Sequence, residues 1–217
     1  HSWNGKFRRP LDLWTPEPGS PMGGSLLWVY EGQTEFWGRV LTARAGLATP
    51  EQTRDLIARV AANHLERTGR VWRSLQDTTT EPALGRRGPK EWPDWQRDRG
   101  DYYSESMLMW LDVDARLREL TGGARSMDDF ARAFFGVADG RMVPLTYRFD
   151  DVAAGLRAVS AGEDWAAFLR RRLDAQGGTL LIDGLARAGW QLAWVGEESA
   201  FARHDRGREP LHNLAHS

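Results

Sequence analysis

The sequence of 217 residues contains no cysteine. It therefore has no disulfide framework and no thiolate zinc site, and the lack of cysteine is compatible with any compartment. No apolar run approaches the roughly 20 residues that a membrane span requires, so no membrane partner is expected. Neither sign of charge is in excess, because 29 Lys and Arg stand against 30 Asp and Glu without a long run of one sign. A surface for nucleic acid is therefore not indicated.

Tryptophan, by contrast, is abundant. Eleven residues of this type indicate bulky packing in a core and by themselves do not show a ligand site. The chain is long enough to form one large domain or two small ones, each with a real core. No internal repeat or low-complexity segment divides it.

Most of the chain carries the signals of helices that are joined by Gly- and Pro-rich loops. Thr49, Pro50 and Gln52 form a capping box that begins one helix. The longest apolar helix is predicted to open at residues 101–106 and to run through Leu120. Shorter helices are predicted after Ser126, from Asp150 to Val159, from Trp165 to Leu173 and from Leu180 to Ala188.

Three segments lack a helical pattern. Residues 6–24 are rich in Pro and Gly and are predicted to be an extended connector, because Pro removes a backbone donor and restricts the residue before it. Residues 71–100, with Thr78-Thr79-Thr80-Glu81-Pro82, are predicted to be irregular. Residues 190–195 alternate loosely and predict a short strand. The expected fold class is mainly α, with few short strands.

Residues 26–41 are predicted to lie on one helix, with Ser25 as its N-cap and an end at Gly46. Four residues at helical spacing are predicted to pack on the core: Tyr30, Thr34, Trp37 and Leu41. Glu31 lies one position from this stripe, so its carboxylate points toward the buried edge of the helix. A carboxylate there needs a cation or several donors. From residue types alone, a solvated or salt-bridged glutamate is favoured over a metal ligand.

Two motifs near the start change that weighting: His1-Ser2-Trp3-Asn4, and Leu27-Trp28-Val29-Tyr30-Glu31-Gly32-Gln33-Thr34-Glu35. Together they resemble the M61 glycyl aminopeptidase family of zinc metallopeptidases, in which His-Glu-x-x-His-Ser-Trp-Asn precedes Leu-Trp-x-x-Glu-Gly-x-Thr-Glu. The resemblance implies that His1 is the second zinc-binding histidine and Glu31 the third ligand. It places the first histidine and the catalytic glutamate four and three residues before His1, outside this chain.

The chemistry of zinc agrees with this assignment. Two histidines at i and i+4 share one face of a helix, and a carboxylate from a second helix leaves the fourth zinc position for water. The resemblance thus implies a helical catalytic subdomain of a gluzincin-type metallopeptidase, with zinc as cofactor and a peptide as substrate. Without the residues that precede His1, the chain is expected not to hold zinc in the native geometry.

Tyr103 is a candidate catalytic residue because the family typically shows Tyr-Tyr-x-Lys-Gly before such a helix, and the resemblance implies that this tyrosine stabilises the oxyanion. Glu105 and Ser106 stand where the family usually has Lys and Gly. This departure keeps the phenol of Tyr103 but changes the charge and the backbone preference beside it. An ordinary aromatic residue at the start of a helix is an equally good interpretation of Tyr103. The two interpretations remain open at this point.

Several other polar residues have weaker signals. Glu35 lies one turn after Glu31 and is either a neighbour of the site or a solvated residue. His64 lies on or beside an apolar helix face, where a structural histidine is favoured. His212 and His216 are at i and i+4 in a polar tail, and we interpret them as an incidental pair.

Three regions are expected. Residues 1–48 carry the second and third ligand positions, residues 49–195 form a helical subdomain, and residues 196–217 lead toward a PDZ-like domain. The predicted function is part of a zinc aminopeptidase that removes N-terminal small residues of the glycine type. The alternative is a non-catalytic helical peptide-binding or scaffold module that keeps the peptidase shape. Neither compartment nor oligomeric state can be predicted.

Overall fold

The computed structural model describes residues 1–84, 101–177, 182–199 and 201–203. Within these ranges the chain forms nine α-helices and two short strands, which confirms the mainly α fold class. The helices are α1 (Leu27–Tyr30), α2 (Gly32–Arg44), α3 (Pro50–Leu65), α4 (Leu75–Leu84), α5 (Asp101–Leu120), α6 (Met127–Phe135), α7 (Phe149–Val159), α8 (Trp165–Leu173) and α9 (Asp183–Arg187). The 3-10 helices are η1 (Leu11–Leu13) and η2 (Thr68–Val71), and the strands are β1 (Arg8–Pro10) and β2 (Leu145–Tyr147).

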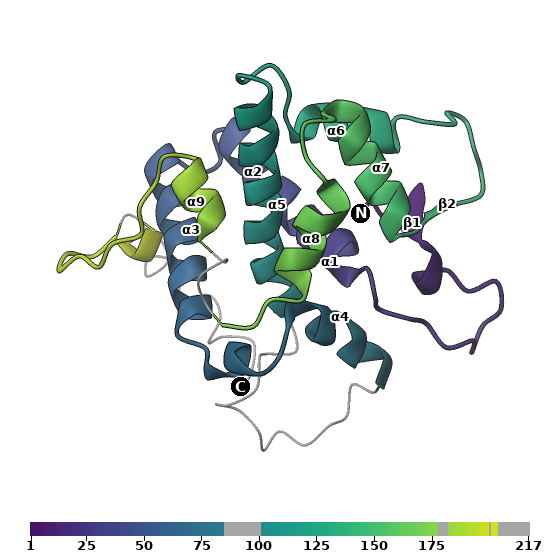
Figure 1. The fold of residues 1–217 in the computed structure, drawn as a ribbon, viewed down its shortest axis with the longest axis horizontal. Helices are drawn as coiled ribbons and strands as arrows, with labels where there is room; N and C mark the ends of the chain where they lie inside the picture. The colour runs from purple at the N-terminus through teal and green to yellow at the C-terminus, as the bar shows by residue number, and fades with distance from the viewer. Residues whose placement is uncertain (85–100, 178–181, 200, 204–217) are drawn as a thin grey trace, which may run out of the picture.

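Helix α5 is the centre of the fold, and α3 and α9 lie on one side of it with α7 and α8 on the other (Figure 1). It contacts α1, α2, α3, α4, α6 and α9. Its position follows from its sequence, because Trp110, Val113 and Leu117 are fully buried. The Trp110 ring stacks on Trp28 with centroids 5.6 Å apart, and its Nε1 donates to the Trp28 carbonyl at 2.9 Å. The central helix is therefore held to α1 by both packing and a buried hydrogen bond.

Helix starts are the best-predicted features of the fold. The Thr49–Gln52 capping box is present at α3, and Ser126 with Asp129 forms a second one at α6. Asp164 caps α8 by accepting from the Ala167 amide at 3.1 Å. Each cap satisfies amides that the helix itself leaves without a partner.

Three local predictions are wrong. Thr78-Thr79-Thr80-Glu81-Pro82 lies in α4 rather than in a loop, and the threonine hydroxyls donate to carbonyls of their own helix, as Thr78 does to Leu75 at 2.7 Å. Residues 190–195 have no regular secondary structure. Ser25 donates to Asp12 Oδ2 at 2.7 Å and does not cap the helix, which begins at Leu27.

The predicted apolar stripe of 26–41 is displaced by about one position. The buried residues of α2 are Gly32, Gln33, Phe36 and Trp37, whereas Leu41 is 45% exposed. The end of the helix is as predicted, because α2 stops at Arg44 and Gly46 adopts a φ of 70°.

The two strands were not predicted as strands, since each has only three residues. They pair in parallel, with Arg8 opposite Leu145 and Pro10 opposite Tyr147. This pairing carries Tyr147, which is 1% exposed, to the start of the chain. A residue from the second half of the sequence thereby reaches the segment that contains His1.

Candidate metal and active site

Glu31 lies at a break between two helices, because α1 ends at Tyr30 and α2 begins at Gly32. Gly32 packs directly on α5, where a Cβ at this position would fall 2.2 Å from the Cβ of Ser106. Tyr103 is one turn before Ser106 on the same helix. The close approach at Gly32 therefore brings the side chain of Glu31 beside that of Tyr103.

The structure also brings His1 to Glu31. The Nε2 atom of His1 lies 3.1 Å from Oε2 of Glu31, and the His1 ring packs on Tyr30 with centroids 4.5 Å apart. The Nδ1 atom of His1 lies 3.0 Å from the carbonyl oxygen of Asn4. A carbonyl only accepts, so Nδ1 carries a proton and donates it to Asn4, and Nε2 is the ring atom that faces the Glu31 carboxylate.

The carboxylate of Glu31 is mostly shielded from water, with a side chain 13% exposed. Within the described part of the chain, no lysine or arginine forms an ion pair with it. Burial raises the pKa of Glu31, and the hydrogen bond from Tyr103 lowers it. The net shift is upward, as expected for a carboxylate that lacks a full counter-charge.

The phenol of Tyr103 completes the group. Burial, followed by the charge of Glu31 and the hydrogen bond to it, raises the pKa of Tyr103 above its ordinary value. The phenol is therefore a neutral donor at physiological pH. The structure thus brings together the three residues proposed from the sequence, His1, Glu31 and Tyr103. Glu35 is different, because it pairs with Arg39 one turn along α2.

A second group of potential metal ligands lies between α3 and α5. The ligand atoms of His64, Asp101 and Glu105 are all within 4.8 Å of one another, and the three residues are buried. His64 Nε2 is 2.8 Å from the Ser104 hydroxyl, and its Nδ1 is 3.8 Å from Asp101 Oδ1 and 3.9 Å from Glu105 Oε2.

Arginines already neutralise this second group. Arg70 forms an ion pair with Glu105, and Arg67 Nε is 3.7 Å from Asp101. A cation would have to compete with two guanidinium groups, so the geometry fits a buried ion-pair cluster rather than a metal site. The structural interpretation of His64 agrees with these contacts.

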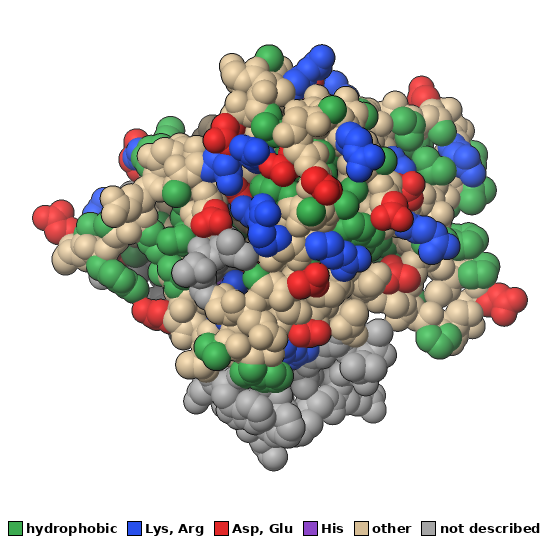
Figure 2. Space-filling view, in the orientation of Figure 1, with side chains coloured by type: hydrophobic (Ala, Val, Ile, Leu, Met, Phe, Trp, Pro, Cys, Tyr) green, Lys and Arg blue, Asp and Glu red, His purple; other side chains and the backbone are tan. Residues whose placement is uncertain are grey.

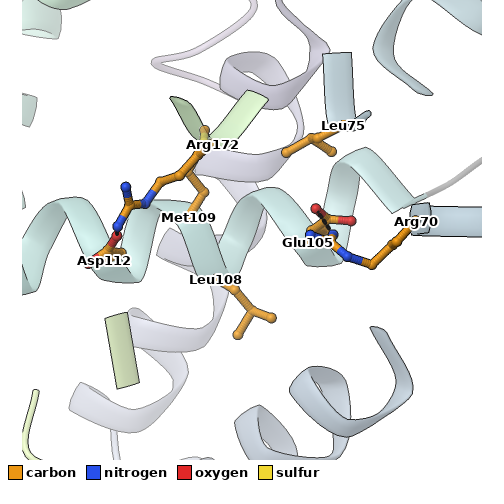
Figure 3. A pocket seen from close by; sticks show the side chains of 7 residues that line it. All are labelled: Arg70, Leu75, Glu105, Leu108, Met109, Asp112 and Arg172. Carbon is orange, nitrogen blue, oxygen red and sulfur yellow. Dashed lines mark ion pairs between the residues drawn. The ribbon is translucent and has the colours of Figure 1, made fainter. Parts of the chain in front are cut away.

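Figure 3 shows that this cluster continues along α5. Two turns after Glu105, Asp112 forms an ion pair with Arg172 of α8, and Arg187 of α9 lies 3.0 Å away. The small cavity between the two ion pairs has a volume of about 20 Å³, which is room for about one water molecule. Sequence reasoning missed these partners, although acidic residues on the apolar face of a long helix are a signal that basic partners must exist.

A larger cavity of about 380 Å³ lies beside His1. Its apolar wall is made by aromatic and aliphatic side chains: Trp3, Trp37, Leu41 and Phe135. Trp3 packs edge-on against Trp37 with centroids 6.0 Å apart, so the tryptophan of the first motif lies next to the site. On the face of the molecule shown in Figure 2, acidic and basic side chains are interspersed and leave no patch of one sign.

Comparison with known families assigns the chain. The model of the M61 glycyl aminopeptidase family matches residues 1–109, which include both motifs and Tyr103. This chain belongs to that family. The assignment confirms the resemblance given by the motifs, and with it membership of a peptidase family.

Among solved structures, an aminopeptidase N family protein from Idiomarina loihiensis is similar, with a TM-score of 0.67 at 19% sequence identity. The similarity shows a shared fold. It covers 86% of this chain but 31% of that protein, so the M61 chain spans about a third of the length of the structure it matches. No curated protein matches the chain. None of the helices in the described ranges is long and apolar enough to cross a membrane.

Proposed function

We propose that the chain is part of a zinc aminopeptidase in which His1 and Glu31 are two of the metal ligands. The observation that carries the proposal is the pairing of His1 Nε2 with a shielded Glu31 carboxylate that has no arginine or lysine partner among the described residues. An ionised carboxylate that is shielded from water lowers the stability of the fold unless a cation binds it. A dication between the two side chains would supply that charge.

The donor set fits zinc. Imidazole nitrogen and carboxylate oxygen are ordinary zinc ligands. The two atoms face each other at 3.1 Å, so one cation could contact both. The protonated Nδ1 of His1, bound to the Asn4 carbonyl, leaves Nε2 as the ligand atom.

The chain's own residues have separate roles in the proposed reaction. Zinc held by these residues would supply a water with a pKa near 7 and would polarise the scissile carbonyl. His1 and Glu31 hold the metal, and the neutral phenol of Tyr103 donates to the developing oxyanion. The remaining histidine and the general base are expected four and three residues before His1, as the resemblance implies. The substrate is a peptide with a small, glycine-type N-terminal residue.

The proposed division of the chain follows from these roles. Residues 1–48 carry the ligands, residues 49–195 form the helical subdomain that provides Tyr103, and residues 196–217 lead toward a further domain. The histidines at 212 and 216 lie outside the described residues.

The proposal is tested by zinc analysis and peptidase assays on the full-length gene product. We expect one zinc per chain after dialysis and release of glycine or alanine from small amino-terminal substrates. A full-length product that binds no zinc and cleaves no peptide would favour the alternative, a helical scaffold that keeps the peptidase shape. The 217-residue chain alone is expected to retain well below one zinc, and chelator-resistant zinc at full stoichiometry there would contradict the assignment of the missing ligands.

A further inference from the structure

A buried hydrogen-bonded unit connects the two proposed ligands. Asn4 is 5% exposed, and its side-chain amide donates to the carbonyl of Val29 at 2.9 Å and to that of Tyr30 at 3.4 Å. These carbonyls close α1 immediately before Glu31. The backbone carbonyl of the same residue accepts from Nδ1 of His1. Asn4 therefore contacts both ligand-bearing segments at once.

The orientation of the Asn4 amide is set from the far end of the sequence. The hydroxyl of Tyr147 lies 2.6 Å from Asn4 Oδ1, and the two residues are 143 positions apart. Because Val29 and Tyr30 offer only carbonyl oxygens, the NH₂ group must face them, and the Tyr147 hydroxyl must donate to Oδ1. Tyr147 is itself fixed by β2, which pairs with β1, and by a T-shaped contact with Phe134 at 5.2 Å.

We infer that Asn4 and Tyr147 are positioning residues for the proposed metal site, and that they set the distance and orientation between His1 and Glu31. Neither side chain reaches the metal in this arrangement. Asn4 fixes the His1 tautomer through its backbone and the end of α1 through its amide, and Tyr147 holds that amide in one orientation. The inference rests on the proposed function for the identity of the metal, but the tautomer of His1 can be measured without it.

A physical reason favours positioning over packing alone. Any nearby carbonyl could satisfy the buried amide of Asn4. Here the amide binds the last carbonyls of α1, just before Glu31, and the backbone carbonyl of Asn4 binds His1. Outer contacts of this kind typically change metal affinity by about 10–100-fold when they are removed. Loss of a buried hydroxyl elsewhere would lower stability without that effect.

The test compares Tyr147→Phe with Thr78→Val in the full-length gene product. Each variant removes one buried hydroxyl, and Thr78 donates only within α4, to Leu75. We expect Tyr147→Phe to raise the zinc Kd about tenfold or more and Thr78→Val to leave it unchanged, with comparable falls in Tm. Asn4→Asp, which replaces the donor with an acceptor, is expected to weaken zinc binding further.

A second readout uses ¹⁵N chemical shifts of the His1 ring in the metal-free protein. The wild type is expected to hold a proton on Nδ1, bound to the Asn4 carbonyl, and Tyr147→Phe to lower the share of rings that are protonated there. A zinc Kd in Tyr147→Phe within twofold of wild type, or an equal change in Thr78→Val, would overturn the inference. If the wild type binds no zinc, the proposed function fails. The positioning role has its own test, because an unaltered protonation of the His1 ring in Tyr147→Phe would overturn it whether or not zinc binds.

Discussion

Two sets of residues around shielded carboxylates lie along α5 and differ in their counter-charges. Glu105 and Asp112, on the buried face of α5, form ion pairs with Arg70 and Arg172. Glu31 faces the same helix, but its partners are the imidazole of His1 and the phenol of Tyr103. The first set is neutralised by the fold, whereas the second leaves negative charge for a cation from outside.

The difference separates charge that the fold itself neutralises from charge that the proposed metal would neutralise. A buried ion pair is at best a modest gain in stability, but it is costly to break because one charge is left behind. A shielded carboxylate without a cation already lowers the stability of the fold. Such a residue is therefore expected where it serves a function that outweighs this loss of stability. Tyr103 and Glu105, two residues apart, belong to the two different sets.

Breaking the structural set should have the largest effect. Arg70→Met leaves Glu105 without its guanidinium and removes a donor to the Gly177 carbonyl. We expect the free energy of unfolding to fall by about 3–5 kcal/mol, measured by denaturant titration. The double variant Arg70→Met/Glu105→Leu should recover much of the loss. If Arg70→Met lowers the free energy of unfolding by less than about 1 kcal/mol, a value typical of surface pairs, the Arg70–Glu105 ion pair does not stabilise the core as a buried pair would.

Tyr103→Phe sharpens the comparison from the functional side. If Tyr103 donates to the oxyanion as proposed, the variant should lower kcat of the full-length gene product by roughly 10²–10³-fold, about 2.7–4 kcal/mol, with zinc content and Tm unchanged. Tyr102→Phe is the matched control, since its ring packs on Tyr103 at 4.8 Å. Wild-type turnover in Tyr103→Phe would return this residue to a structural role.

The candidate site could be predicted because its residues are held in short motifs. His1, Glu31 and Tyr103 were all proposed from the family pattern, and the structure places them together. Their roles as ligands and donor remain proposals. Helix starts were equally accessible, because a cap such as that of Thr49 depends on three neighbouring residues.

What could not be predicted depends on long-range pairing. The partners of Glu105 and Asp112 come from η2 and α8, and no local pattern connects them to α5. The Tyr147–Asn4 contact is of the same kind. The loop predicted at Thr78–Pro82 was wrong because low helix propensity was outweighed by hydroxyl bonds within the helix and by the fully buried positions of Thr78 and Thr79.

Gly32→Ala should have an intermediate effect, because its Cβ would overlap that of Ser106. We expect a loss of about 1–3 kcal/mol in unfolding free energy, which is typical of overpacking. Gly38→Ala is the matched control in the same helix, where nothing lies within 4 Å of the added Cβ, and it should gain about 0.5–1 kcal/mol from helix propensity. Both are measured on the 217-residue chain.

Ser106→Gly should rescue Gly32→Ala if the overlap is the cause, since it removes the atom that the new Cβ meets. Restored stability in the double variant would connect the departure at Ser106 from the family pattern with the close approach at Gly32. An unchanged loss would place the strain elsewhere.

Thr49→Ala should have the smallest effect. It removes the cap of α3 at a position remote from both sets, so we expect a loss of about 1 kcal/mol and an unchanged zinc Kd. Thermal melts measure the loss of stability, and zinc titrations measure the Kd. A changed zinc Kd in Thr49→Ala would mean that a loss of stability alone can weaken zinc binding, without any change at the site.

Glu31→Gln tests the central claim most directly, through zinc titration and thermal melts of the metal-free full-length protein. The raised pKa of Glu31 means that its ionised form is disfavoured in the fold, so stability that is present below the ordinary pKa is lost as pH rises through the folded pKa. Neutralising the side chain should therefore leave the metal-free Tm at pH 7 unchanged or higher. Zinc affinity and activity should fall together, by more than the roughly 10–100-fold typical of outer contacts. A loss of about 3–5 kcal/mol in the metal-free protein, with unaltered zinc binding, would contradict the account.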